Sequence, residues 1–251
     1  MLYLLRRHGV PIKAQLRTSL VLAYAMPEHV LRPLLPPGLT LDVYGGFGFL
    51  AIAMVEARDL RPAFLPASFG MNFFLAGYRI FTRYQTRGGR TLRGLRILRS
   101  DTDRPSMRMF GNLLTHYGYE LSKCRNRRTE STYSVEVCSP HSDADLQVEA
   151  DIVNDPRMPP PGSLFPDLRE ARKFAGPLPF TFDYERQTHS IIRVEGVRRE
   201  WNPRPVSVKV FRNTFLEQKM FRTAGATLAN AFYLEDVPYA WKPGIREALP
   251  T

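Results

Sequence analysis

The densest group of polar side chains in the sequence could form an anion-binding or acid–base site. It contains Arg99, Asp101, Asp103, Arg108 and Asn112. Arg99 ends a run whose preceding odd-numbered residues are apolar, so strand alternation would place its guanidinium in a cavity beside Asp101. Arg108 and Asn112 follow on a helical pattern and are candidate ligand contacts. The alternative is structural, because a strand-to-helix turn needs capping oxygens and an ion pair, and for Asp103 we favour capping.

A second polar group follows directly and consists of His116, Tyr119 and Glu120. Glu120 could act as a base if it is buried, and Tyr119 could donate a hydrogen bond to a carbonyl oxygen. His116 is a candidate ligand contact, although a lone histidine at a helix end is more often structural. His189 and Glu195 would share one strand face, but no third ligand stands at metal spacing, so we predict no metal site.

The composition describes a globular protein with an excess of positive charge. The 251 residues are 44% hydrophobic and carry a formal net charge of +11, which raises the question of nucleic-acid binding. The arginines, however, are spread along the whole chain, with only a modest cluster from Arg125 to Arg128. Aromatic residues do not interleave with basic ones as they do in RNA-binding sheets. Nucleic acid is therefore not an expected partner.

The sequence also indicates where the protein resides. Its longest apolar run, near residues 47–55, is about half of what a membrane-spanning helix needs, so no membrane segment is expected. The first ten residues place their apolar side chains before their arginines, which is the reverse of a secretory signal. With only Cys124 and Cys138 present, we expect two free thiols and no disulfide framework. These features predict a cytoplasmic location.

The elements that must position the polar groups are mostly strands. We expect a strand over residues 13–26, a short helix after Pro27, and a helix over 105–116, where apolar residues recur at helical spacing. Two hairpins are expected, the first joining 39–43 to 46–56 and the second joining 71–84 to 92–99. Further strand-like runs continue to the C-terminal part. The pattern favours one mainly antiparallel β domain over residues 1–251, closed into a barrel so that no strand edge is exposed.

Several blocks of the sequence resemble a known superfamily. The block LRTSLVLAYAMPEHVLRPLLPPGLTLD, from Leu16 to Asp42, resembles the opening of acetoacetate decarboxylase-like proteins. LRILRSDTD, FGNLLTHYGYELSKCR, EWNPRPVSVKVF and FYLEDVPYAW resemble its uncharacterised branch, domain of unknown function 2071. The resemblance implies a cone-like, mostly antiparallel β-barrel with a few flanking helices, an enclosed cavity and a homo-oligomer.

The resemblance also bears on the chemistry. Such decarboxylases form a Schiff base on a lysine whose pKa is lowered by a second lysine in an apolar cavity. The stretch that corresponds to this pair reads YGYEL, which puts Tyr119 and Glu120 at the two positions, and Lys123 is three residues further on. Arg17 falls where the family has an arginine that meets the substrate carboxylate, although a structural ion pair would also explain it. Ala51 stands where the family has a glutamate.

We therefore predict a pocket that binds a small anionic organic molecule, an acid or a ketone, with Arg17 and Arg99 facing one cavity. If the protein is an enzyme, it would be a lyase using noncovalent acid–base chemistry by Glu120 or Asp101, assisted by Tyr119 and without a cofactor. The alternative is a noncatalytic ligand-binding or assembly domain that kept the fold.

Overall fold

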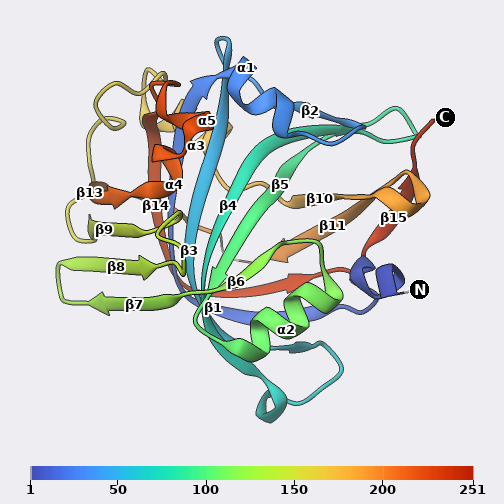
Figure 1. Cartoon of the computed structure of the whole chain (residues 1–251). Helices are drawn as coiled ribbons and strands as arrows, with labels where there is room; N and C mark the ends of the chain where they lie inside the picture. The colour runs from blue at the N-terminus through green and yellow to red at the C-terminus, as the bar shows by residue number, and fades with distance from the viewer. Residues whose placement is uncertain (1, 200, 251) are drawn as a thin grey trace.

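The computed structural model describes residues 2–199 and 201–250, and it is mainly β with a few short helices (Figure 1). The strands are β1 (Ile12–Pro27), β2 (Leu39–Leu41), β3 (Phe47–Pro62), β4 (Met71–Gln85), β5 (Thr91–Thr102), β6 (Tyr119–Leu121), β7 (Lys123–Arg128), β8 (Thr132–Cys138), β9 (Leu146–Asp151), β10 (Phe180–Glu185), β11 (Ser190–Arg198), β12 (Arg204–Pro205), β13 (Ser207–Asn213), β14 (Thr227–Trp241) and β15 (Ile245–Ala248). The α-helices are α1 (Glu28–Leu31), α2 (Pro105–Leu114), α3 (Leu168–Ala175), α4 (Thr214–Glu217) and α5 (Lys219–Arg222), and the 3-10 helices are η1 (Leu2–Arg7), η2 (Arg32–Leu34), η3 (Ala67–Phe69) and η4 (Arg186–Thr188). No helix in the described part of the chain is long and apolar enough to span a bilayer.

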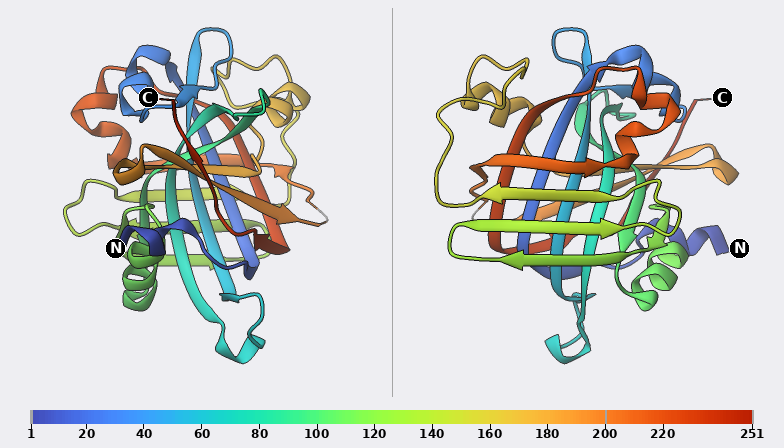
Figure 2. Two further views of the ribbon diagram at one scale, coloured as in Figure 1. Left: turned by 90° about the vertical axis from the view of Figure 1, so that its right-hand side faces the viewer. Right: turned by 60° about the vertical axis from the view of Figure 1, so that its left-hand side comes forward.

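The strands form two sheets. In the larger sheet the order runs β14, β1, β3, β4, β5, β10, β11, and β11 also pairs with β14, so the path of strands returns to its start. All these pairings are antiparallel except that of β5 with β10. The smaller sheet, in the order β13, β9, β8, β7, lies across the outer face of the larger one (Figure 2).

The long central strands are buried on both faces, and β3 shows why. Its even-numbered side chains, such as Ile52 and Met54, pack in the core against residues of the smaller sheet that include Val135. Its odd-numbered side chains point the other way, into the space that the larger sheet surrounds, and they include the small residues Ala51 and Ala53. Small side chains on that face leave room inside the sheet.

Most of the expected elements are confirmed. β1, the hairpin of β4 and β5, and α2 lie where the sequence predicts them. The expected hairpin of 39–43 with 46–56 is wrong, because β2 pairs with β4 and places Leu39 opposite Tyr84. Asp103 does not cap α2: its Oδ1 accepts a hydrogen bond from the backbone N–H of Phe74 at 2.7 Å, and the N-cap residue is Arg104.

Candidate functional site

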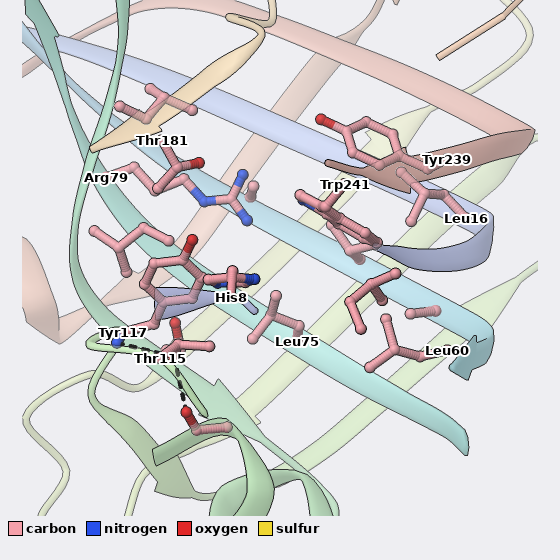
Figure 3. Close-up of a pocket in the computed structure, with 18 of the residues that line it drawn as sticks. His8, Leu16, Leu60, Leu75, Arg79, Thr115, Tyr117, Thr181, Tyr239 and Trp241 are labelled. Carbon is pink, nitrogen blue, oxygen red and sulfur yellow. Dashed lines mark hydrogen bonds between the residues drawn. The ribbon is translucent and has the colours of Figure 1, made fainter. Parts of the chain in front are cut away.

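A cavity of about 530 Å³ lies on the inner side of the larger sheet. Its wall is built by side chains from β1, β3, β4, β5 and β14, together with α2 and the segment after η1. Most of the lining is hydrocarbon. Polar side chains gather at one part of the wall, where Arg79, His8, Tyr117 and Thr181 lie near one another (Figure 3).

Arg79 is the cation of this cavity. It lies in the middle of β4, and its guanidinium projects into the space between Tyr117, Trp241 and Tyr239 (Figure 3). Within residues 2–199 and 201–250 it has no ion-pair partner, and its buried Nε has no hydrogen-bond partner. Burial lowers its pKa, but a guanidinium remains charged near neutral pH. A buried guanidinium charge without a partner costs free energy unless an anion or water forms hydrogen bonds with it.

Small residues make room for Arg79. An added Cβ at Gly77, two residues earlier on the same strand face, would lie 3.0 Å from the Arg79 Nε. Ala51 of β3 is directly opposite Arg79 in the strand pairing, and its methyl group cannot pair with the guanidinium. Among the described residues that line the cavity there is no aspartate or glutamate. The arrangement leaves the guanidinium open to a bound anion.

The other two arginines that line the cavity already donate hydrogen bonds to backbone oxygens of the protein. Arg61 donates hydrogen bonds to the backbone oxygens of Asp59 at 2.7 Å and Leu65 at 3.1 Å. Arg198 donates to the backbone oxygen of Pro177 at 2.8 Å, and its guanidinium lies 4.2 Å from the ring centroid of Trp201. Arg79 is therefore the lining arginine, in the described part of the chain, that keeps its donors for a ligand.

Tyrosine hydroxyls surround the arginine. Tyr117 and Tyr119 are buried against the cavity, and burial raises the pKa of both, so each is neutral and can donate a hydrogen bond. Tyr119 lines the cavity, and its role as a hydrogen-bond donor to a ligand stays a prediction. Its ring fits because α2 has a glycine beside it: a Cβ at Gly111 would lie 2.4 Å from Tyr119 Cδ2.

His8 contributes an imidazole that can accept a proton. Its ring centroid lies 5.3 Å from that of Tyr117, and its buried Nε2 has no hydrogen-bond partner among the residues that the structure describes. Burial, and to a smaller extent the nearby His116, lower the pKa of His8 from 6.5 to about 4. At pH 7 the imidazole is neutral, and no sequence pattern indicated this residue.

The cavity opens between three segments that are distant in the sequence. The lining residues that are exposed are Leu5, Gly9, Val10, Phe69, Phe110 and Leu114. They come from η1 and the turn after it, from η3, and from α2. Figure 1 and Figure 2 show η1 beside α2, with the β3–β4 connection at the same end of the molecule. We call this set of six residues the mouth.

Arg17, predicted to hold the anion, does not face the cavity. β1 has one more residue than β3 at this point, and Arg17 is the extra residue of a β-bulge. Leu16 and Ser19 on either side of it both line the cavity, while the Arg17 side chain is 56% exposed. Its Nη1 donates to Asp236 Oδ1 at 2.6 Å. For Arg17 the structure therefore shows the alternative considered from the sequence, a structural ion pair.

Arg99 is also turned away, for the same reason. The pairing of β5 with β4 shifts by one residue beside Arg99, so that Ile97 and Ser100 line the cavity and Arg99 does not. Its guanidinium donates to Asp101 and, at 2.6 Å, to Asp143 Oδ2. The prediction that Arg17 and Arg99 face one cavity is wrong.

The acid–base candidates Asp101 and Glu120 lie outside the cavity lining. Asp101 is buried, and its carboxylate accepts hydrogen bonds from Arg99 and, at 2.8 Å, from the hydroxyl of Ser122. Glu120 is exposed on β6, because Tyr119 takes the inward position of that short strand. Neither carboxylate can reach a ligand in the cavity from these positions.

The remaining predicted contacts surround the site without lining it. Arg108 is exposed on α2. Asn112 holds the backbone of Tyr119, accepting from its N–H and donating to its carbonyl oxygen, both at 2.8 Å. His116 is half-buried, and burial lowers its pKa. Asn112 therefore positions a cavity residue, whereas Arg108 and His116 do not line the cavity.

No group of three metal-ligating side chains occurs in the part of the chain that is described. The six lysines are all exposed and all lie in that part, and none of them lines the cavity. Lys123, the candidate closest to the aligned lysine pair, is on β7 of the smaller sheet.

Comparison with known proteins gives a family and a fold. The model of the DUF2071 family, described as an uncharacterized conserved protein, matches residues 13–238. No curated protein matches the sequence.

Solved structures of the same fold have very different sequences. Acetoacetate decarboxylase from Legionella pneumophila has a TM-score of 0.63 and 12% identity, over 95% of this chain and 87% of that chain. An acetoacetate decarboxylase-like enzyme from Sphingomonas wittichii RW1 has a TM-score of 0.60 and 12% identity, over 97% and 94%. The enduracididine biosynthesis enzyme MppR complexed with pyruvate has a TM-score of 0.60 and 9% identity, over 94% and 90%. At these identities the likeness shows a shared fold.

Proposed function

Since the chain belongs to the DUF2071 family and has the acetoacetate decarboxylase-like fold, we propose that it binds a small organic acid or ketone in its central cavity, with Arg79 holding the carboxylate. The ring of strands from β14 to β11 would be the cone-like barrel that encloses the ligand. MppR, which shares the fold, has been crystallised with pyruvate, a small keto acid. The same class of ligand fits a cavity whose polar groups converge on one guanidinium.

The observation that carries this proposal is the unpartnered Arg79. A guanidinium binds a carboxylate through two parallel hydrogen bonds, and those bonds are stronger in a site shielded from water. Tyr119 or Tyr117 can donate a further hydrogen bond to the carbonyl oxygen of a keto acid or ketone. The lining has no acid in its described residues that would repel the ligand.

Schiff-base chemistry has no support from the cavity wall. A catalytic lysine needs a desolvated amine that touches the substrate, whereas the six lysines of this chain are exposed. At the two aligned positions, Tyr119 offers a phenol and Glu120 points to solvent. The reaction that fits this wall proceeds without a Schiff base.

A second candidate function is a lyase-type acid–base reaction, and His8 is the observation that favours it. Its neutral imidazole faces the cavity and can take a proton from the carbon next to a carbonyl group. Tyr119 would stabilise the enolate oxygen that forms, and the imidazolium would return the proton to the enolate or to a leaving group. The noncatalytic alternative keeps the same ligand contacts and lacks this proton transfer.

Calorimetry tests the binding proposal with pyruvate and acetoacetate as probes. Arg79→Met keeps much of the volume of the side chain and removes the charge. We expect binding to weaken by about 1.5–3 kcal/mol, the range for hydrogen bonds to charged groups. Arg17→Met is the matched control, since its guanidinium is exposed and paired with Asp236, and it should bind as the unmodified protein does. Equal affinities in all three proteins would contradict the proposal.

Proton exchange separates the two functional candidates. In D2O, a His8 base would exchange the methyl protons of pyruvate faster than solvent alone does, and NMR measures that exchange directly. His8→Gln should remove the acceleration without removing binding. Binding without any accelerated exchange in the unmodified protein would leave the noncatalytic function.

A further inference from the structure

The cavity is much larger than a small keto acid requires. An apolar cavity of about 150 Å³ is enough to hold benzene, and cavities of roughly 300–1,000 Å³ hold drug-sized ligands. This cavity measures about 530 Å³. An acid of the size of pyruvate would fill only a fraction of it and would leave hydrocarbon walls facing empty space or water.

The cavity is also elongated along β4. Both Met71, at the beginning of the strand, and Phe81, ten residues later, line it. At about 3.3 Å per strand residue, the lining extends over roughly 30 Å of that strand. Arg79 lies near one end of this stretch, and Met71 adjoins η3 at the mouth. The distance from Arg79 to the η3 side of the mouth is therefore long compared with a small acid.

Polarity changes along the same direction. Arg79, Tyr117 and Thr181 form the polar part of the wall, whereas Leu60 and Leu75 lie on the other side of the cavity (Figure 3). Phe73, Val55 and Ala57 continue the apolar wall between them. A ligand that matches this wall carries its charge at one end and hydrocarbon along the rest.

The mouth continues the apolar surface outward. Phe69 is 69% exposed, Phe110 is 45% exposed and Leu5 is 46% exposed, and all three are also part of the cavity lining. Exposed apolar side chains that gather from three separate segments mark a binding site more often than a plain surface. The continuity of this surface with the cavity indicates that it receives the same ligand.

Resting on the proposed function, we infer that the ligand of this site is an amphipathic carboxylate with an extended apolar body. Its carboxylate meets Arg79, its hydrocarbon body lies along Leu75 and Leu60, and its far end reaches the mouth between η1, η3 and α2. A long-chain aliphatic acid has this chemistry and the length to reach η3.

A series of straight-chain carboxylates tests the inference by calorimetry, using butanoate, hexanoate, decanoate and tetradecanoate with the full chain. Each buried methylene should lower the dissociation constant about fourfold until the cavity is filled. Alcohols of the same lengths should bind more weakly, and Arg79→Met should weaken the acids but not the alcohols. An affinity that stays flat from butanoate to tetradecanoate would overturn the amphipathic ligand.

The outcomes separate this inference from the binding proposal on which it rests. Flat affinities that still depend on Arg79 would reject the apolar body and keep the carboxylate site. The carboxylate anchor would be rejected if affinity rises with chain length but is equal for acids and alcohols and does not change in Arg79→Met.

A substitution on the η3 side of the mouth gives an independent measurement. Phe69→Ser changes a highly exposed side chain, so folding should be unaffected, and it should weaken tetradecanoate at least threefold while butanoate binding stays unchanged. Phe211→Ser is the matched control, because Phe211 is 61% exposed on β13 of the smaller sheet and does not line this cavity. Equal tetradecanoate affinity in both variants would place the ligand away from η3.

Discussion

Replacing Ala51 with glutamate should supply Arg79 with the anionic partner that it lacks. Ala51 is buried, lines the cavity and is directly opposite Arg79 in the pairing of β3 with β4. Side chains at opposite positions have Cβ atoms about 4.5–5.5 Å apart, so a glutamate carboxylate can reach the guanidinium. Ala51→Gln is the control, since it has nearly the same volume without the charge.

The expected gain follows from the surroundings of the pair. Exposed ion pairs contribute roughly 0–1 kcal/mol, while hydrogen bonds to charged groups shielded from water contribute about 1.5–3 kcal/mol. Arg79 is shielded and has no partner to lose in the described structure, so the second range applies. Ala51→Glu should therefore unfold with a free energy about 1.5–3 kcal/mol higher than Ala51→Gln. It should also bind pyruvate at least tenfold more weakly than Ala51→Gln, because the new carboxylate would occupy the hydrogen-bond donors of Arg79.

Urea unfolding at pH 7 measures the difference, and a double-mutant cycle attributes it to the pair. In the Arg79→Met background, glutamate at position 51 should lose its advantage over glutamine. If Ala51→Glu is no more stable than Ala51→Gln with Arg79 present, the guanidinium already has a partner and the reasoning about the anion site fails.

Three further predictions follow from the lysines, from His8 and from Gly111. Treatment with acetoacetate and borohydride should leave the mass of the protein unchanged, because every lysine is exposed and none lines the cavity; an adduct on Lys123 would contradict this. The folded protein holds the pKa of His8 at about 4, so the unfolded chain takes up a proton first as the pH falls below 6.5. Stability should decrease by up to about 3 kcal/mol between pH 7 and pH 4 from this group, and urea unfolding should show a smaller acid loss for His8→Gln. Gly111→Ala should lower the melting temperature, because its Cβ would lie 2.4 Å from Tyr119. This loss should outweigh the roughly 1 kcal/mol by which alanine is more favourable than glycine in a helix. Gly88→Ala is the control and should change the melting temperature little, since its Cβ would meet no atom closer than 3.9 Å.

The strands and helices that could be predicted from the sequence are those set by local patterns. The turn residues Gly88 and Gly89 between two apolar runs predict the β4–β5 hairpin, and the spacing of apolar residues after Pro105 predicts α2. The partner of β2 could not be predicted in this way, since its pairing with β4 joins residues more than forty positions apart, such as Leu39 and Tyr84. Local patterns do not determine which strand a short segment joins.

Two β-bulges determine where Arg17 and Arg99 point. Arg99 was placed in the cavity by counting alternate residues along a regular strand, and Arg17 by its match to the arginine of the family. A bulge adds a residue to one strand of a pair and reverses the alternation beyond it, and it arises from the pairing of two strands. One strand alone contains no signal for it, so both arginines were assigned to the wrong face.

Strand alternation could have identified Arg79 as a candidate cavity residue. Phe73, Leu75, Gly77 and Phe81 share its parity on β4, so Arg79 interrupts a face that is otherwise apolar or small from residue 73 to residue 81. If one face of the strand were in solvent, an arginine on that face would need no functional explanation. The interpretation becomes specific only when the other face is also known to be buried, which depends on the smaller sheet packing across it.

The alanine at position 51 connects the sequence comparison with the chemistry of the cavity. The resemblance places a glutamate of the family at this position, where this chain has alanine. In the structure the same residue lies opposite Arg79, so an acid there would sit beside the guanidinium and compete with any bound carboxylate. The alanine and the unpartnered cation are therefore neighbours in the same part of the wall. An unpartnered guanidinium opposite an alanine supports the proposed binding of a carboxylate at this part of the wall.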